Sequence, residues 1–206
     1  MFIKVCGITN LEDALTAIES GADALGFNFY PKSPRYITPE NARRIIEQLP
    51  SEVMSVGVFV NESAPEEVAR ISDSVGLKAV QLHGDESPEY CSALRGRFVI
   101  KALSVGEEFE PERVKDYDTN AILLDAYARD ARGGTGRVVD WEVARRVREL
   151  VPQLFLAGGL SPENVAEAIA AVDPYAVDAC SSLESVPGLK NAERVRAFIA
   201  AARVKP

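Results

Sequence analysis

The stretch LFLAGGLSPENVAEAIAAVDPYAVD, residues 154–178, decides the fold that the sequence predicts. It begins and ends with short, largely apolar runs, Leu154–Ala157 and Tyr175–Asp178, which are typical of strands buried on both faces. Between them, apolar side chains recur over residues 165–172 with the 3.6-residue period of a helix. A capping hydroxyl at Ser161 stands directly before Pro162, the residue type favoured at the first helical position. Strand, helix and strand in this order predict the unit from which parallel sheets are built.

The same alternation of apolar runs and amphipathic stretches extends over the whole chain of 206 residues. Helix-start signals stand at Thr9-Asn10-Leu11-Glu12, which fits a capping box, and at Thr38-Pro39-Glu40. The weakest helical stretch, Pro111–Tyr117, lies between the fifth and sixth runs. Eight strands are expected, over Ile3–Cys6, Ala24–Phe29, Met54–Val60, Ala79–Leu82, Val99–Leu103, Ala121–Asp125, Leu154–Ala157 and Tyr175–Asp178.

Two architectures combine parallel strands with helical connections, the closed (β/α)₈ barrel and the open doubly wound sheet. Eight strand–helix units favour the barrel, although 206 residues lies at the short end of its range. A dinucleotide-binding sheet is disfavoured because no GxGxxG follows the first strand. No linker, low-complexity tract or composition shift marks a boundary. We therefore predict an α/β fold, a single (β/α)₈ (TIM) barrel domain over residues 1–206.

The balance of charges argues against some classes of partner. The formal net charge is −8 at pH 7, and phosphate-backbone binding needs clustered Lys and Arg, so nucleic acid and anionic membranes are disfavoured. No apolar run approaches the roughly 18 residues of a membrane span, and the first residues lack a secretory pattern. The three cysteines fit neither a disulfide framework nor a CxxC metal site. We expect a cytoplasmic protein with reduced thiols at Cys6, Cys91 and Cys180.

In a (β/α)₈ barrel the active site is built from the C-terminal ends of the strands. Titratable residues fall at several of those predicted ends: Cys6 ends the first strand, His83 follows the fourth, Asp125 ends the sixth and Asp178 ends the eighth. Arg35 lies in the loop after the second strand. Because these positions meet at one rim of the barrel, the sequence predicts an active site there.

Each of these residues also has a structural interpretation. Cysteine is among the most buried residue types, but a thiol at a strand end before a helix N-terminus can be reactive. Asp125 could cap a loop, although a carboxylate at that rim favours chemistry. His83 is the only histidine, which excludes a multi-histidine metal site, and it could be a satisfied structural side chain. Arg35 could be a solvated loop charge.

Two glycine-rich segments lie near the same rim. Gly158-Gly159 separates the seventh strand from the helix expected after Ser161, where backbone N–H groups can bind a phosphate unless the pair forms only a tight turn. Gly133-Gly134-Thr135-Gly136 follows Asp125 in a long loop. This second segment could be a mobile lid or a flexible connector, and it is not a Walker motif because no Gly-Lys-Ser/Thr follows.

Taken together, the segments at the rim resemble the phosphoribosylanthranilate isomerase family over nearly the whole chain. The resemblance is specific because eight short motifs occur in the family's order and spacing. They are KVCGIT (4–9), GFNFYPKSPRYI (26–37), VGVFVN (56–61), VQLHG (80–84), LLD (123–125), GGTG (133–136) with Asp140-Trp141, AGGL (157–160) and VD (177–178).

The resemblance implies an Amadori rearrangement of N-(5′-phosphoribosyl)anthranilate to an open-chain 1-deoxyribulose phosphate, a step of tryptophan biosynthesis. It implies no cofactor and no metal. By similarity, Asp125 is the general acid that protonates the ribose ring oxygen, and Cys6 is the general base that removes the C2′ proton. A thiol suits that role because the iminium formed by ring opening acidifies the proton, so a small downward pKa shift suffices near pH 7. Asp125 must instead hold a proton, which burial in a closed site favours.

The resemblance also implies how the substrate is held. Arg35 matches the position that pairs with the anthranilate carboxylate, a task that suits a forked guanidinium. Asp178 matches the residue near the anthranilate nitrogen, and we place His83 with these two among the substrate-binding residues. The phosphate is expected on backbone amides around Gly158, Gly159, Ser181 and Ser182.

Ser182 departs from the family, which usually has glycine at this position of the expected phosphate loop. If the position requires a positive φ, serine introduces strain of about a kcal/mol or somewhat more. If the glycine only permits close approach of the backbone, the serine hydroxyl can donate to the phosphate. At worst, substrate binding is expected to be weaker.

Other phosphosugar barrels are the nearest rivals to this interpretation. A metal-dependent pentose-phosphate epimerase needs two or more histidines at the rim, and indole-glycerol-phosphate synthase needs a lysine acid for which Cys6 is a poor substitute. A catalytically silent phosphate-binding barrel is disfavoured because Cys6 and Asp125 are both present. A second activity on a related aminoaldose phosphate stays open. We expect a small phosphorylated substrate, no nucleic acid or membrane partner, and a monomer or homodimer.

Overall fold

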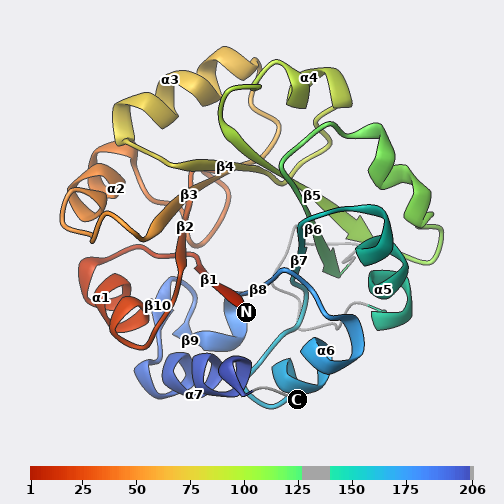
Figure 1. The fold of residues 1–206 in the computed structure, drawn as a ribbon. Coiled ribbons are helices and arrows are strands. Elements are labelled where there is room, and N and C mark those ends of the chain that lie inside the picture. Colours follow the sequence, from red (N-terminus) through yellow and green to blue (C-terminus); the bar gives the residue numbers. More distant parts are fainter. Residues whose placement is uncertain (127–139, 205–206) are drawn as a thin grey trace.

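Eight parallel strands close into a barrel in the computed structural model, which describes residues 1–126 and 140–204 (Figure 1). The strands follow one another around the barrel in chain order, and β8 pairs with β1 in parallel, so the barrel has no free sheet edge. Closure confirms the predicted (β/α)₈ barrel and excludes the open doubly wound sheet. The strands are β1 (Phe2–Cys6), β2 (Ala24–Asn28), β3 (Met54–Phe59), β4 (Ala79–Leu82), β5 (Phe98–Val105), β6 (Ala121–Ala126), β7 (Leu154–Leu156) and β8 (Ala176–Ala179).

Helices surround the strands as an outer ring in Figure 1, again in chain order. Most connections between strands are α-helical, whereas the stretch between β5 and β6 forms a 3₁₀ helix, which agrees with its weak helical pattern. The α-helices are α1 (Leu11–Glu19), α2 (Pro39–Ile46), α3 (Pro65–Val75), α4 (Pro88–Ser92), α5 (Trp141–Leu150), α6 (Val165–Val172) and α7 (Ala192–Arg203), and the 3₁₀ helices are η1 (Pro111–Asp116) and η2 (Ser181–Leu183).

The helix starts agree only in part with the capping signals in the sequence. Thr38 caps α2 as predicted, because its side chain accepts from the backbone N–H of residue 41. The predicted box at Thr9 is wrong: Asn10 caps α1, and the Thr9 hydroxyl instead donates to the carbonyl of Gly188. Ser161 does not begin α6, which starts at Val165 after a turn. At α1, a competing acceptor in the folded protein thus decides which of two adjacent polar residues becomes the cap.

Alternate side chains on each strand pack on opposite faces, giving two separate apolar layers. Most buried apolar side chains lie between the strands and the helices. The barrel interior holds a second, smaller layer, and further along several of the same strands the inward-facing positions become polar, at Lys4, Gln81, Asp125 and Asp178. The apolar interior layer consists of Ala24, Val56, Ala79, Ile100, Ala102, Ala121, Leu123, Phe155, Ala157 and Ala176.

A short antiparallel hairpin, which was not among the predicted elements, follows η2. It pairs β9 (Glu184–Val186) with β10 (Leu189–Lys190) and precedes α7. The hairpin lies beside α7 and α1 in Figure 1. It matters for the site because it contributes the charged residues Glu184 and Lys190.

Two expectations concern the remaining parts of the chain. The Gly133–Gly136 segment, predicted as a lid or a connector, lies outside the described residues. No helix within the described ranges is long and apolar enough to cross a membrane.

Candidate active site

A buried ion pair lies in the polar part of the barrel interior. Lys4 of β1 and Asp178 of β8 are cross-strand partners, and Lys4 Nζ lies 2.9 Å from Asp178 Oδ2. Burial acts to lower the pKa of Lys4, but the charges of Asp178 and Cys6 outweigh it and hold that pKa above its usual value. Burial raises the pKa of Asp178 to about 7, reinforced by the charges of Cys6 and Asp125 and opposed by Lys4. Asp178 Oδ1 is buried and has no hydrogen-bond partner among the described residues, so it can receive a donor from a ligand.

Cys6, the last residue of β1, is buried at the same end of the barrel. Its pKa is held well below the usual value, first by a hydrogen bond with Cys180 and then by the positive charges of Lys4 and Lys190, although burial opposes this. Gly26 on β2 leaves room for the thiol, because a Cβ there would stand 2.6 Å from Cys6 Sγ. The arrangement favours a thiolate that can act as a base.

Asp125, near the end of β6, is buried and linked to the only histidine. His83 Nε2 lies 3.2 Å from Asp125 Oδ2, and His83 Nδ1 lies 2.7 Å from Gln81 Nε2. When the Gln81 amide donates to Nδ1, the ring carries its proton on Nε2 and donates to Asp125. His83 therefore orients the carboxyl group of Asp125, a role that the sequence did not separate from substrate binding.

Arg35, in the loop between β2 and α2, is held by Glu184 of β9. Its Nε and Nη2 groups donate to the Glu184 carboxylate at 2.7–3.1 Å, and Lys190 Nζ lies 3.0 Å from Glu184 Oε1. Burial acts to raise the pKa of Glu184, but these two cations outweigh it and lower that pKa. Arg35 Nη1 makes no hydrogen bond within the described ranges. The ion pair thus fixes the guanidinium and leaves one of its ends for an anionic ligand.

The loop after β7 has the backbone conformation that its glycines permit. Gly158 and Gly159 have φ values of 77° and 71°, in the left-handed region that favours glycine. Asn164 holds this loop, since it donates to the Gly159 carbonyl at 3.0 Å and accepts from the Ser161 N–H at 2.8 Å. The predicted pair therefore forms a shaped turn before α6.

Ser182 lies in η2, beside the loop after β7. It is not among the described non-glycine residues with positive φ, so the strain considered for serine at this position does not arise. Its hydroxyl donates to the carbonyl of Leu160 and ties η2 to the β7–α6 loop. The Ser182 hydroxyl could donate to a phosphate only if its hydrogen bond to the Leu160 carbonyl broke.

Sequence reasoning missed several residues that shape the site. Lys4 and Gln81 are polar residues inside otherwise apolar strands, and a long polar side chain in a strand buried on both faces is a signal that could have revealed them. Cys180, Glu184 and Lys190 lie beyond β8, and the turn signal Pro187-Gly188 could have revealed the hairpin that brings the last two back to Arg35.

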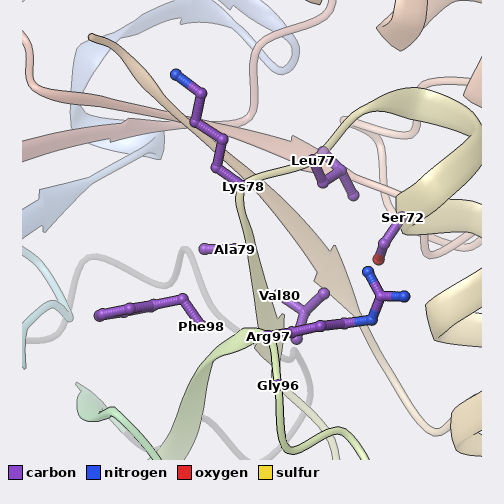
Figure 2. A pocket seen from close by; sticks show the side chains of 8 residues that line it. All are labelled: Ser72, Leu77, Lys78, Ala79, Val80, Gly96, Arg97 and Phe98. Atoms are coloured by element: carbon purple, nitrogen blue, oxygen red, sulfur yellow. The ribbon is translucent and has the colours of Figure 1, made fainter.

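A separate hollow of about 180 Å³ lies at the opposite end of the barrel (Figure 2). Ala79 and Phe98, which line it, are the first residues of β4 and β5. Figure 2 shows Arg97 extending from the start of β5 toward Ser72 of α3, and the Arg97 guanidinium is bound to Asp73 at 2.7 and 2.8 Å. In the described part of the chain, no group of three or more His, Cys, Asp or Glu side chains is placed to hold a metal ion.

Comparison with known proteins identifies the family. Residues 3–201 match the family model described as N-(5′-phosphoribosyl)anthranilate (PRA) isomerase. An N-(5′-phosphoribosyl)anthranilate isomerase from Trichlorobacter lovleyi is 53% identical over 197 residues, which cover 96% of this chain and 95% of the relative.

Solved structures agree in fold over nearly the full length. A phosphoribosylanthranilate isomerase in complex with reduced 1-(o-carboxyphenylamino)-1-deoxyribulose 5-phosphate superposes with a TM-score of 0.89 at 47% identity, covering 98% of both chains. Monomers generated from the dimeric enzyme of Thermotoga maritima superpose with a TM-score of 0.88 at 46% identity, also covering 98% of both. With this match in sequence, fold and length, the chain belongs to the N-(5′-phosphoribosyl)anthranilate isomerase family of enzymes.

Proposed function

We propose that this chain converts N-(5′-phosphoribosyl)anthranilate to 1-(2-carboxyphenylamino)-1-deoxyribulose 5-phosphate, an aldose–ketose isomerisation of tryptophan biosynthesis. The observation that carries the proposal is that a candidate base, Cys6, and a candidate acid, Asp125, lie at the same end of a closed barrel. Cys6, whose pKa is lowered by Cys180 and Lys4, ends β1, and buried Asp125 lies near the end of β6. A Cys-type base with a carboxyl acid suits acid–base chemistry without a bound metal.

The first step is opening of the ribose ring. Asp125 donates its proton to the ring oxygen, the C1′–O bond breaks, and the nitrogen lone pair forms the C1′=N bond of an iminium. The hydrogen bond at 3.2 Å from His83 supports this role, because it orients the carboxyl group. Burial of Asp125 keeps water from competing for the proton.

The second step is proton abstraction at C2′. The Cys6 thiolate removes this proton, forming an S–H bond, and the electrons of the C–H bond form C1′=C2′ while the nitrogen regains its lone pair. The product is an enolamine, which becomes the ketone when C1′ gains a proton and the C2′ hydroxyl loses one. The lowered pKa of Cys6 supports the role, since a thiolate must already be present near neutral pH.

Four features support the proposed binding of substrate. The free end of Arg35 suits the anthranilate carboxylate, because a fixed guanidinium loses little entropy on binding. Asp178 Oδ1, which is unpartnered among the described residues, suits the anthranilate N–H. His83 lies beside Asp125, where a substrate can also reach it. The phosphate is expected on backbone N–H groups around Gly158, Gly159, Ser181 and Ser182. Gly158 and Gly159 have positive φ, a conformation that lets the β7–α6 loop turn its N–H groups toward a ligand.

The direct test is loss of anthranilate-type fluorescence when the purified chain meets freshly prepared phosphoribosylanthranilate. We expect rapid turnover by the parent and a loss of about a hundredfold to ten-thousandfold in kcat for Cys6→Ala and for Asp125→Asn, as for removal of a general base or acid. Cys91→Ala is the matched control, since Cys91 is buried in α4, outside the barrel interior, and we expect it to keep parental kcat. No turnover by a folded parent would reject the isomerase proposal, and full activity in either variant would reject that residue's role.

The tie between Ser182 and Leu160 leads to a prediction about phosphate binding. Ser182→Gly removes the hydrogen bond that joins η2 to the β7–α6 loop, so we expect KM to rise severalfold while kcat changes little. Steady-state kinetics and competition by inorganic phosphate measure this. A lower KM in Ser182→Gly would instead mean that the serine obstructs the phosphate.

Several wider expectations stay predictions of the same proposal. Residues 1–206 act as one catalytic domain that works as a monomer or homodimer without nucleic acid, cofactor or metal. A cytoplasmic location is supported by the need for a reduced thiol at Cys6, because an oxidised sulfur cannot accept the C2′ proton.

A further inference from the structure

Cys6 and Cys180 continue the pairing of β1 with β8. The register runs through Lys4 with Asp178 and Val5 with Ala179, and Cys6 and Cys180 are the residues that directly follow this last pair along the two chains. In parallel strands, residues two apart share a face, and the Lys4–Asp178 ion pair shows that this face is the barrel interior. The two thiols are therefore neighbours inside the same end of the barrel.

The backbone after Cys6 also lies against the second thiol. Gly7 has a φ of 78°, and a Cβ at this position would stand 2.8 Å from Cys180 Sγ and 2.9 Å from Arg35 Cδ. The N–H groups of Gly7 and Ile8 both donate to the carbonyl of Gly26 at 2.9 Å, which fixes the turn. Cys180 is thus held between the end of β1 and the loop that carries Arg35.

Ionisation of both neighbouring thiols is disfavoured, because two thiolates would repel each other in a buried site. Lys4 stands beneath Cys6 as a counter-charge. Cys180 Sγ lies 3.8 Å from a carboxylate oxygen of Glu184, whose negative charge disfavours a second anion there. Lys190 Nζ lies 3.8 Å from Cys180 Sγ, but it is paired with Glu184 at 3.0 Å.

The remaining charges around the two sulfur atoms also favour an ionised Cys6 and a protonated Cys180. Glu184 already accepts from two cations, so the S–H of Cys180 is the weakest of its donors and is free to turn toward Cys6. The pKa of Cys180 is raised well above its usual value, first by the hydrogen bond with Cys6 and then by burial. The titratable and charged groups that act on the pair are Lys4, Arg35, Asp178, Glu184 and Lys190, and Asp125 acts in turn on Asp178.

We propose that Cys180 is a positioning residue for the base of the reaction, whose S–H donates a hydrogen bond to the Cys6 thiolate and keeps that sulfur ionised and oriented. Its consequence for catalysis rests on the proposed function, but its effect on the Cys6 thiol does not. When Cys6 takes the C2′ proton, the thiolate that accepts this bond no longer exists. The protonated Cys6 is then a stronger acid with Cys180 beside it than without it.

The test is the pH dependence of alkylation of Cys6 by iodoacetamide, with the modified cysteine located by peptide mass. Cys180→Ala and Cys180→Val remove the S–H donor, and valine has a side-chain volume close to that of cysteine. Cys180→Ser replaces the thiol with a hydroxyl, which can still donate. We expect the midpoint for Cys6 to rise by about one pH unit in both variants without a donor, and to stay near the parental value in Cys180→Ser. Cys91→Ala, remote from the pair, should leave the midpoint unchanged.

Circular dichroism establishes that each variant is folded, and either donor-free variant suffices for the test. An unchanged midpoint in a folded Cys180→Ala or Cys180→Val protein overturns the proposal. A shift in Cys180→Ser as large as in Cys180→Ala also overturns it, because packing rather than hydrogen bonding would then be responsible.

The isomerase reaction gives a second, separable readout. We expect the acid limb of the pH profile of kcat/KM to move upward in Cys180→Ala by the same amount as the alkylation midpoint, with rescue by Cys180→Ser. If the parent shows no turnover, the proposed function fails while the thiol titration still decides the role of Cys180. If the parent is active but the acid limb of kcat/KM in Cys180→Ala does not move with the alkylation midpoint of Cys6, Cys180 does not act on catalysis through Cys6.

Discussion

At the scale of single residues, the room for the Cys6 thiol depends on Gly26. A Cβ on Gly26 would stand 2.6 Å from Cys6 Sγ and 3.1 Å from the Cys6 Cα, and the latter atom belongs to the backbone and cannot turn away. We expect Gly26→Ala to lower kcat by about a hundredfold, because a displacement of about 1 Å is enough to misalign a base. Steady-state kinetics measure the loss of kcat, and thermal unfolding shows whether the variant is folded.

The control for this substitution is Gly76→Ala. Gly76 ends α3 with a φ of 78° and has open space where a Cβ would stand. It should therefore lose about 1 kcal/mol of stability from backbone strain but keep its kcat. An unchanged kcat in Gly26→Ala would show that the Cys6 side chain can shift to another position and still act as the base.

The raised pKa of Asp178 makes the stability of the fold depend on pH. That pKa is about 7, against a usual value of 3.8, so between these pH values the folded protein holds a proton that the unfolded chain has released. Its contribution to the free energy of unfolding therefore falls as pH rises from about 4 to about 7, by at most roughly 4 kcal/mol.

Urea unfolding of the parent and of Asp178→Asn at intervals across this window isolates the effect of Asp178. We expect the stability of the parent to decline relative to that of the variant as pH rises. Curves that run parallel from pH 4 to pH 7.5 would contradict the assignment of a raised pKa to this carboxyl group.

At the scale of elements, a second buried ion pair holds the β4–α4 loop, the segment that begins with His83. Lys101 Nζ of β5 lies 2.6 Å from Glu86 Oε2 and donates to the Gly84 carbonyl at 2.8 Å. Glu86 in turn accepts from the backbone N–H groups of Asn61 and Gly84 at 2.8 and 2.9 Å. One carboxylate thus joins the loops after β3 and β4 to β5.

We expect Lys101→Met alone to lower the free energy of unfolding by about 3–5 kcal/mol, because it leaves Glu86 charged and unpaired in the interior. The double variant Lys101→Met/Glu86→Gln should be more stable than this single variant, since the uncompensated charge is gone. Urea unfolding measures both.

The exposed pair of Arg95 and Asp118 provides the comparison for the buried one. Arg95→Met should change stability by less than about 1 kcal/mol, because solvent screens an exposed pair. A Lys101→Met effect equally small would mean that the buried pair does not hold the loop.

At the scale of the whole molecule, the two ends of the barrel have different tasks. The candidate site lies at the C-terminal ends of the strands, whereas Arg203 at the end of α7 closes the opposite end. It donates to the carbonyls of Met1 and Gly21 at 2.8 and 2.9 Å and to Asp23 Oδ2 at 2.9 Å. The last helix is thereby attached to the starts of β1 and β2.

We expect Arg203→Ala to lower the free energy of unfolding by about 1–2 kcal/mol and to leave kcat and KM unchanged, since residues at this end serve stability rather than chemistry. Thermal and urea unfolding with parallel kinetics measure it. Arg145→Ala, which removes an exposed contact within α5, should shift stability by about 0.5 kcal/mol or less. A clear loss of kcat in Arg203→Ala would show that the two ends are coupled.

The strands were predicted within two residues of their observed bounds because they are buried on both faces and read as apolar runs. The candidate rim also followed from the sequence, since parallel topology brings all eight strand ends to one side. Helix starts were less predictable. The Thr9 hydroxyl is taken by the Gly188 carbonyl, whereas the Ser161 hydroxyl accepts from the Glu163 N–H but caps only a turn that precedes α6.

Lys4 and Lys101 show what the sequence alone determines and what it leaves to tertiary structure. Each is a lysine inside an apolar strand, and both strands could be predicted from their composition. Lys4 points into the barrel toward Asp178, whereas Lys101 points outward toward Glu86, which lies in the β4–α4 loop. Composition determines that these segments are strands. Only closure of the barrel sets the register, and because side chains alternate between faces, a shift of one residue would exchange the two environments.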